Sequence, residues 1–492
     1  MNNFIRRILF FILFCLSFCT NDQCFAAKWN ESGRYSITWY NKSQSNFKIK
    51  SAAELAGVAY LLNNGYTNFE GKTITLSSDI DLSPCIWITA GNSERPFKGI
   101  FDGAGHTIFG LDIRTESDSN KKYFGLFGEI REATIKNLNI SGKIRLNFDS
   151  YFPEQWVGSF AASGYLGTLT NCMANVYIEY QRKQTNSEKY NLYMGGMIGK
   201  DELSNLEYCL YKGKIVCRFG ENLTDMYFTG GGVYIGGMCG STSGSQWGTN
   251  GIIIGCGAEF EDVDIITANS RNTKNGMPII FGGLFGNGSK GSIKYSYALL
   301  PFIRVRHYSK SAGNMQIGGI AGSYSDFNSE AIKNCYSIIG NIDAGASNSN
   351  TRLCYGGISG GGYTSTEPYV ANFSNNDINI NETNLPKKLG LFGSEAYSSG
   401  EMKTNNFLDE LNLYSVLKDG NPVWHITSIY PIPIGNKMAN CDSPTIDTEI
   451  ISESDCLIYN LNGQAVDDST ESLSPGIYII KNGSNVKKIF VR

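Results

Sequence analysis

A glycine-containing pattern recurs along most of the chain, and it limits the possible folds more than any other feature. In its full form, two adjacent glycines are followed three residues later by a third, with apolar residues between and around them. The period of about 33 to 46 residues is typical of repeat architectures. The clear copies are Phe124–Gly128, Met194–Gly199, Ile235–Gly240, Phe281–Gly286, Ile317–Gly322 and Tyr355–Gly360, with weaker copies at Val157–Ala161 and Leu389–Gly393.

A second apolar segment follows each glycine segment at a similar interval. Its copies are Ile135–Leu138, Leu169–Cys172, Leu206–Cys209, Ile254–Cys256, Ile293–Ser296 and Ile332–Cys335. A third short strand follows, as in Ser141–Ile144 and Gly213–Ile215. None of these strands is long enough to bury a face alone, so the repeats must stack around a shared core. This predicts a parallel β-helix. A propeller is less favoured, because its blades need hairpin turns that are not spaced this way here.

Two further segments are expected to cover the solenoid. Ser51 to Asn64 has the pattern of an amphipathic helix with Ser51 as N-cap, and Leu55, Val58, Ala59 and Leu62 share one face. We expect this helix to cap the open end of the stack, because a bare terminal coil exposes unpaired strand edges. Near the other end, the sequence predicts a helix over Glu401 to Leu413, and an apolar run over Trp424 to Pro433 could close the core.

The first residues predict export. Arg6 and Arg7 precede an apolar run, and small residues precede Ala27, so residues 1–26 are expected to form a cleaved signal peptide. Lipidation at Cys19 is an alternative, which Phe18 disfavours. No later stretch reaches about 18 apolar residues, so the mature chain should have no transmembrane span. The net charge of −3 gives no reason to expect nucleic acid as a partner.

The segment from Ile49 to Ile113, with Asp79–Leu82 and Phe97–Ile108 as its motifs and the glycine repeats behind it, resembles the GLUG-motif surface proteins of Bacteroidetes. The resemblance covers roughly residues 48 to 435. It implies a right-handed β-helix, an adhesin-like role and a place on the outer-membrane surface or outside the cell. We therefore expect residues 48 to about 395 to form a right-handed, three-faced parallel β-helix, with an extension over residues 27–47. The same repeats accompany IgA-protease-like metallopeptidases, whose zinc-binding helix this chain lacks.

The C-terminal region reads as a separate small β-sandwich-like domain. Residues 436–448 are polar and predict a linker, and residues 449–492 alternate strands with turns. This tail resembles the sorting domain of type IX secretion cargo, although it is shorter than usual. The resemblance implies recognition by secretion machinery, through residues that match its motif and its basic last strand: Pro475, Gly476, Tyr478, Lys487 and Lys488.

The sequence offers few groups for catalysis or metal binding. Cys172, Cys209, Cys256 and Cys335 hold one repeat position, which Leu138 and Ser296 hold elsewhere, so we expect a stacked inward column of free thiols and no zinc site. The three histidines, His106, His307 and His425, are far apart in sequence and carry no nucleophile motif. The acids that a β-helix lyase or hydrolase could use are Glu259, Glu261, Asp262 and Asp264, with Asp79, Asp81 and Asp102 near the start of the chain. Of these, Asp79 and Asp81 are expected to cap turns.

We therefore expect a surface adhesin or ligand-binding scaffold without catalysis, and a carbohydrate-active β-helix enzyme is the alternative. No catalytic, cofactor or metal residue is assigned. Trp247, within the insertion from Ser241 to Gly251, is the candidate ligand-binding residue, because aromatic side chains on loops commonly contact ligands. The expected partners are glycans or proteins of a host or neighbouring cell. The ligand itself cannot be derived from the sequence.

Overall fold

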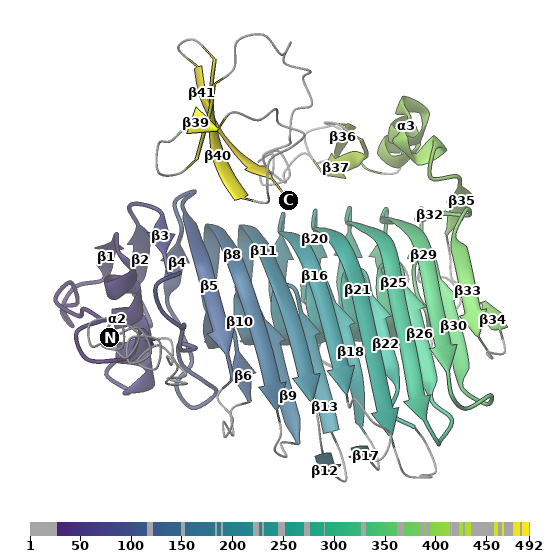
Figure 1. Ribbon diagram of the computed structural model, residues 1–492, viewed down its shortest axis with the longest axis horizontal. Coiled ribbons are helices and arrows are strands. Elements are labelled where there is room, and N and C mark those ends of the chain that lie inside the picture. Colours follow the sequence, from purple (N-terminus) through teal and green to yellow (C-terminus); the bar gives the residue numbers. More distant parts are fainter. Residues whose placement is uncertain are drawn as a thin grey trace, which may run out of the picture. The chain divides into compact units, whose positions relative to one another are not determined.

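The computed structural model describes residues 27–115, 122–148, 153–182, 185–187, 190–219, 226–228, 231–244, 251–269, 276–289, 291–325, 331–361, 369–383, 387–389, 394–413, 415, 423–426, 429–433, 457–460, 465–466, 476–482 and 485–491. The chain divides into two compact units, Met1–Ala439 and Asn440–Arg492. The first unit is a right-handed parallel β-solenoid of about six turns, as predicted. Figure 1 shows its strands stacked side by side along the long axis.

Each coil passes through three parallel sheets in turn, and each sequence repeat forms one coil. Sheet A contains β6 (Tyr123–Phe124), β9 (Glu154–Gly158), β13 (Tyr190–Gly195), β18 (Gly231–Gly236), β22 (Ile279–Gly282), β26 (Asn314–Gly318), β30 (Arg352–Gly356) and β34 (Lys387–Leu389). Sheet B contains β7 (Phe127–Arg131), β10 (Ala161–Tyr165), β14 (Ile198–Glu202), β19 (Cys239–Ser243), β23 (Phe285–Ser289) and β27 (Ala321–Ser325). We number the coils 1 to 6 after these six strands of sheet B.

Sheet C holds the longest strands and extends furthest along the solenoid. In coils 1 to 6 it contains β8 (Thr134–Phe148), β11 (Thr168–Arg182), β15 (Asn205–Glu207) with β16 (Leu210–Phe219), β20 (Ile252–Ile254) with β21 (Gly257–Asn269), β24 (Ser292–Lys294) with β25 (Tyr297–Ser309), and β28 (Ile332–Lys333) with β29 (Tyr336–Ala346). A partial seventh coil adds β31 (Tyr369–Val370), β32 (Phe373–Asn375), β33 (Asn379–Thr383) and β35 (Glu395–Tyr397). A separate two-stranded sheet pairs β12 (Thr185–Ser187) with β17 (Met226–Phe228).

The N-terminal region continues sheet C and ends the stack with a helix. Its elements are β1 (Asn46–Ile49), α2 (Ala52–Asn63), β2 (Thr73–Leu76), β3 (Ile80–Asp81), β4 (Ile100–Asp102) and β5 (Thr107–Arg114). Ser51 caps α2 by accepting a hydrogen bond from the Glu54 N–H at 3.3 Å. The predicted apolar face is buried against the solenoid core. Figure 1 shows α2 at the N-terminal end of the stack, where the cap was expected.

The repeated glycines are required by close packing and not by an unusual backbone conformation. They form the bend between sheets A and B, and in the full copies their φ angles are negative. A Cβ atom added to Gly195 would lie 1.8 Å from the Ile198 carbonyl oxygen, and one added to Gly196 would lie 2.3 Å from the Gly237 oxygen of the next coil. A Cβ on Gly199 would lie 2.6 Å from the backbone nitrogen of Val157 in the preceding coil. Backbone therefore packs directly on backbone here.

A second bend interrupts sheet C, and it explains the cysteine column. The residue before each column position has a left-handed backbone, as in Asn171 with φ of 51°. The strand register then stacks Cys172, Cys209, Cys256, Ser296 and Cys335 in successive coils, all fully buried. Each thiol or hydroxyl donates to the carbonyl two residues earlier, at 2.8 Å for Ser296 and 3.4 to 3.5 Å for the cysteines. The predicted inward column is confirmed, and in coils 2 to 6 the position holds a small hydrogen-bond donor, whereas coil 1 has the buried Leu138 there.

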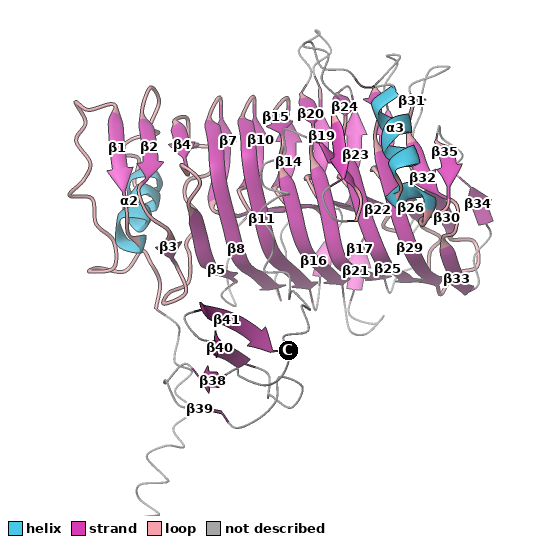
Figure 2. Ribbon diagram, turned by 90° about the horizontal axis from the view of Figure 1, so that it is seen from above, coloured by secondary structure: helices cyan, strands magenta, loops and turns pink. Residues whose placement is uncertain are grey.

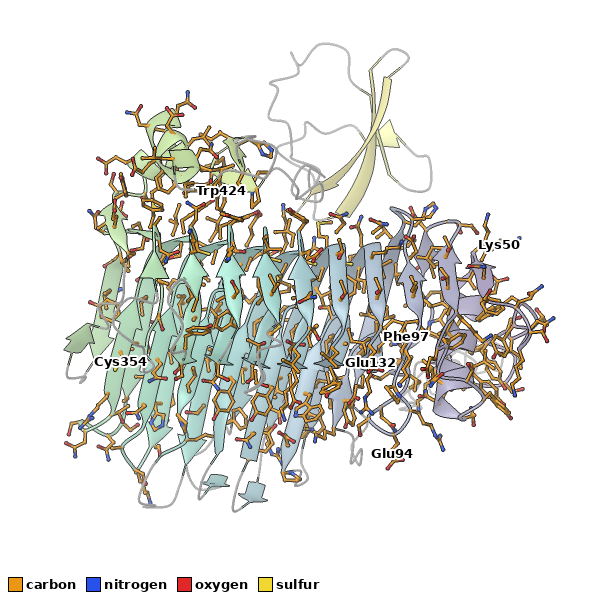
Figure 3. The ribbon with its side chains drawn as sticks, turned by 180° about the vertical axis from the view of Figure 1, so that it is seen from behind. Lys50, Glu94, Phe97, Glu132, Cys354 and Trp424 are labelled. Carbon is orange, nitrogen blue, oxygen red and sulfur yellow. The ribbon has the colours of Figure 1, made fainter. Side chains whose placement is uncertain are left out.

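The C-terminal segment of the first unit covers the side of the solenoid. It contains η1 (Glu401–Lys403), α3 (Asn405–Leu413), β36 (Trp424–Ile426) and β37 (Pro431–Pro433). Its apolar side chains form a cluster with Tyr297, Tyr336 and Phe373, which is separate from the main core. The Tyr336 hydroxyl donates to the Pro431 oxygen at 2.7 Å. The segment was expected to close the core, but it instead covers outward-facing side chains of sheet C. Figure 2 shows α3 beside the solenoid, and Figure 3 labels Trp424 in this segment.

The second unit contains one antiparallel sheet in its described part. The strand order is β39 (Ala465–Val466), β38 (Leu457–Asn460), β40 (Gly476–Asn482) and β41 (Asn485–Val491). The three predicted strand regions are therefore present. The described residues form a single four-stranded sheet, and a second layer of the expected β-sandwich is not among them.

Candidate functional site

The residues proposed from sequence as ligand or sorting contacts are only partly described. Trp247 and Pro475 lie outside the described residues. Gly476 and Tyr478 lie in β40, where Tyr478 pairs with Ile489 of β41. Lys487 and Lys488 lie in β41 opposite Ile480 and Ile479. These placements give the backbone positions of the tail residues and leave their sorting role a prediction.

Three of the four coil 4 carboxylates considered for a lyase or hydrolase are neutralised by basic residues of neighbouring coils, and the fourth, Glu261, is exposed. Three acids of coil 4 face three bases of coil 3: Glu259 lies 3.2 Å from Lys212, Asp262 lies 2.6 Å from Lys214, and Asp264 lies 2.8 Å from Arg218. Asp264 also lies 4.0 Å from Arg304 of coil 5. General acid and base pairs need carboxyl groups that face each other across a substrate. These acids instead face cations within the sheet.

The remaining acids and the histidines serve local structure. Asp81 and Asp102 accept hydrogen bonds from backbone N–H groups two residues later, at 2.8 and 2.9 Å, as turn caps do. Asp79 accepts from the Thr107 N–H at 2.9 Å and lies 3.2 Å from His106. His307 is fully buried with Nε2 3.0 Å from the Met277 oxygen, and burial lowers its pKa.

His425 lies in β36, away from the other two histidines along the chain. Within the described ranges, no group of three His, Cys, Asp or Glu side chains could hold a metal ion. The Cys335 thiol of the column is likewise unsuited to nucleophilic chemistry, because burial raises its pKa to about 12. The Cys209 thiol differs, because hydrogen bonds with Cys172 and Cys256 lower its pKa despite its burial. The described residues that the sequence put forward do not assemble into an active site.

A concave surface, which sequence reasoning missed, runs along the bend between sheets A and B. The outward side chains of the two sheets approach each other there: Lys200 of sheet B lies 5.5 Å from the ring centroid of Tyr193 and 4.8 Å from that of Trp156, both of sheet A. Lys200 also lies 3.9 Å from Glu154 of sheet A. Outward side chains can meet in this way only if the sheets form a re-entrant angle. The strip of surface inside this angle is parallel to the solenoid axis.

The angle is filled by large side chains in coils 1 to 3. Lys122 lies 3.6 Å from the ring centroid of Trp156 and forms an ion pair of 2.7 Å with Glu154. Tyr123 packs edge-on against Trp156 with ring centroids 5.1 Å apart. As a result, Trp156 is only 8% exposed although it points away from the core, and its indole N–H has no hydrogen-bond partner. This part of the strip is closed.

The angle is lined by smaller side chains in coils 4 to 6, and we call this part the open strip. In register along sheet A its residues are Tyr234, Ile280 and Gln316, and in register along sheet B they are Ser241, Asn287 and Ser323. All six are partly exposed. None of the six is charged at neutral pH, and partial burial raises the pKa of the Tyr234 phenol further.

The polar side chains that line the open strip have no hydrogen-bond partner among the described residues. They are those of Ser241, Asn287, Gln316 and Ser323. Tyr234 stacks on Tyr193 with ring centroids 5.0 Å apart and 11° between the ring planes. Its other ring face is directed toward coil 5, where the register neighbour is the smaller Ile280. The open strip thus combines a partly exposed tyrosine side chain with amide and hydroxyl groups that have no hydrogen-bond partner among the described residues.

The sequence contains a signal for this surface. In each full repeat, the two residues that line the strip flank the glycine motif and lie seven positions apart, as do Tyr234 and Ser241. An aromatic residue precedes the first glycine by two positions in coils 1 to 4, at Tyr123, Trp156, Tyr193 and Tyr234. Alignment of the repeats would have shown both features.

The fold and the strip define a class of protein: a parallel β-solenoid that presents a mixed aromatic and polar surface. A scan against protein-family models found no match, and a search of curated proteins found none either. Among solved structures, a Bacteroides ovatus protein regarded as a candidate immunoglobulin A1 protease is similar, with a TM-score of 0.41 and 15% identity over 80% of this chain and 94% of that chain. None of the described helices is long and apolar enough to cross a membrane.

Proposed function

We propose that this protein is an exported cell-surface scaffold that binds a ligand without catalysis, as GLUG-motif adhesins are expected to do. The observation that carries the proposal is the contrast between two surfaces of the same solenoid. On sheet C, three acids of coil 4 are paired with three bases of coil 3. In the open strip, the polar side chains are unpaired and partly exposed. Binding surfaces need such unsatisfied groups on a rigid scaffold.

The enzyme alternative has less support. A carbohydrate-active β-helix enzyme would need convergent acids or an acid beside a metal ion. Each of the coil 4 acids Glu259, Asp262 and Asp264 has a cationic partner within 3.2 Å. The proposal therefore keeps catalysis as the second candidate and assigns it no residues.

Export and surface display belong to the same proposal. They rest on the signal-peptide pattern of residues 1–26 and on the resemblance of residues 449–492 to the type IX sorting domain. N-terminal sequencing of the protein from cell fractions should find Ala27 as first residue, in the outer-membrane or extracellular fraction. Removal of residues 449–492 should reduce surface display. An intact Met1 in the cytosol would contradict export.

The binding role is tested with the mature protein, residues 27–492, on an array of host glycans and extracellular-matrix proteins. A reducing-sugar assay on plant and host polysaccharides runs in parallel. Saturable binding without product supports the scaffold. Product release that is lost in Glu261→Ala or Asp262→Ala would establish the enzyme instead. Trp247→Ala tests whether the insertion from Ser241 to Gly251 contributes to the contact.

A further inference from the structure

We infer that the open strip binds a linear, uncharged glycan that lies parallel to the solenoid axis across coils 4 to 6. This inference rests on the proposed ligand-binding function and names the site and the ligand class. The strip runs along the axis because its two walls are columns of residues in register, with Tyr234, Ile280 and Gln316 facing Ser241, Asn287 and Ser323. A ligand that follows the columns must be extended and unbranched over this length.

The side-chain chemistry of the strip matches a sugar. The faces of a pyranose ring are apolar and its edges carry hydroxyl groups. Tyr234 is partly exposed and offers its ring and phenol hydroxyl, an apolar body with a polar tip of the kind enriched at binding surfaces. Asn287 and Gln316 each offer amide donors and an acceptor, which can pair with the donors and acceptors of sugar hydroxyls. Ser241 and Ser323 add hydroxyl groups on the wall formed by sheet B, where Asn287 also lies.

The spacing between successive coils also matches the spacing between sugar units of a linear glycan. Adjacent coils of a parallel β-solenoid are about 4.8 Å apart, which is close to the length of one pyranose ring in an extended chain. Each coil therefore presents one residue from each wall for each sugar unit. Successive sugars can then make similar contacts with successive coils.

The charge pattern favours an uncharged chain. None of the six lining residues carries a charge at neutral pH, and the lysines nearest the strip are already engaged with carboxylates. Lys122 lies 2.7 Å from Glu154, and Lys200 lies 3.9 Å from the same carboxylate. An acidic glycan would find no free cation in the strip, so its desolvated carboxylates would be unpaired.

An extended polypeptide is a poorer fit. Peptides that bind along a solenoid or sheet usually pair with a free strand edge. The strands of sheet A in coils 4 to 6, and those of sheet B in coils 4 and 5, are hydrogen-bonded on both sides, as β22 is to β18 and β26. In coil 6, β27 is the last strand of sheet B, and the Ala321 and Tyr324 N–H groups on its outer side donate to the Ile358 and Gly361 oxygens. The strip can therefore contact a ligand through side chains only, which suits the hydroxyl groups of a glycan.

Coil 3 supplies the design of the blocking variant. Lys200 occupies the position that Asn287 occupies two coils later, and it helps to fill the angle there. Asn287→Lys should therefore fill the open strip with a side chain that the fold already accepts at this register. Tyr234→Ala removes the aromatic side chain of the open strip. Ser289→Lys is the matched control, because Ser289 lies on the same strand two residues beyond the strip.

The experiment measures binding of the mature protein to soluble linear polysaccharides by affinity electrophoresis and calorimetry. The probes are uncharged β-glucans and mannan, with polygalacturonate and hyaluronate as acidic counterparts. We expect saturable binding of at least one uncharged probe. Tyr234→Ala and Asn287→Lys should each weaken it about tenfold or more, which corresponds to about 1.4 kcal/mol, whereas Ser289→Lys should not. Circular dichroism and thermal unfolding establish that each variant is folded.

Two sets of results would overturn the inference. Binding of acidic probes alone, or binding that is unchanged in both Tyr234→Ala and Asn287→Lys, would exclude the strip as an uncharged-glycan site. If the host array then still shows a ligand that binds without turnover, the scaffold function stands and only this inference fails. If neither experiment finds a ligand, the proposed function fails with it.

Discussion

Replacing Asp201 by Asn should stabilise the protein at neutral pH. Asp201 lies in β14 with only 2% of its surface exposed. One carboxylate oxygen accepts a hydrogen bond from the Thr242 hydroxyl at 3.0 Å, but the other has no partner. Burial raises the pKa of this carboxyl from 3.8 to about 6, because the charged form loses its hydration.

The sign and size of the effect follow from linkage. Since the folded pKa is above the unfolded one, the folded state binds the proton more tightly, and folding is favoured most below pH 3.8. Stability is lost as the pH rises from 3.8 to about 6 and does not change further above that. A shift of about two units at 1.36 kcal/mol each amounts to about 3 kcal/mol. An Asn side chain at this position does not titrate, so its contribution to stability does not depend on pH. Its amide oxygen can still accept the hydrogen bond from the Thr242 hydroxyl.

The assay is urea unfolding of wild type and Asp201→Asn between pH 3.5 and 7.5. The difference in unfolding free energy should grow by about 3 kcal/mol in favour of the variant across this range. Glu94→Gln, at an exposed residue labelled in Figure 3, measures the general effect of removing one negative charge. A difference between Asp201→Asn and wild type that stays constant with pH would refute the reasoning.

Three further substitutions test the packing of the coils. Gly283→Ala places a Cβ 2.0 Å from the Gly319 oxygen and should lower the free energy of unfolding by about 3 kcal/mol or more. Gly400→Ala is the control and should change it little, because the nearest neighbour of the added Cβ is 4.0 Å away. Equal melting temperatures of the two variants would contradict the packing argument. In urea unfolding, the free energy of unfolding of Cys335→Ser should stay within about 1 kcal/mol of that of wild type. Cys335→Val should lower it by about 1 to 3 kcal/mol, because the Lys333 carbonyl loses its hydrogen-bond donor. Asp264→Ala should lower the free energy of unfolding by about 1 to 2 kcal/mol, because Arg218 and Arg304 lose their shared partner. The loss should be smaller at high salt, which screens these charges, and a loss that does not depend on salt would count against this explanation.

The solenoid could be predicted from sequence because its signal is local and repeated. Each coil carries its own glycine bend, and the column from Cys172 to Cys335 recurs at one place in every repeat. The helix around Leu55 was predictable for a similar reason, since its N-cap and apolar spacing lie within a few turns of chain. These features need no knowledge of how distant segments meet.

The location of the C-terminal segment and the open strip could not be predicted in the same way. Tyr297 and Tyr336 point outward, and their local sequence is that of ordinary strand residues, although they belong to one apolar cluster with α3 and Trp424. The strip depends on the angle between two sheets, which brings Tyr193 and Lys200 together across the bend. A sequence fixes which residues face outward, but the angle follows from how tightly the glycine bends pack.

The pairing of acids and bases on sheet C has a consequence for how the coils assemble. Repeats of similar sequence can stack in the wrong order, because any coil can hydrogen-bond to any other. Coil 3 carries Lys212, Lys214 and Arg218 where coil 4 carries Glu259, Asp262 and Asp264. If coil 4 were skipped, the strand register would place Arg218 opposite Arg306 of coil 5, and like charges would repel. The alternation of charge therefore favours stacking of coil 3 on coil 4 over stacking of coil 3 on coil 5.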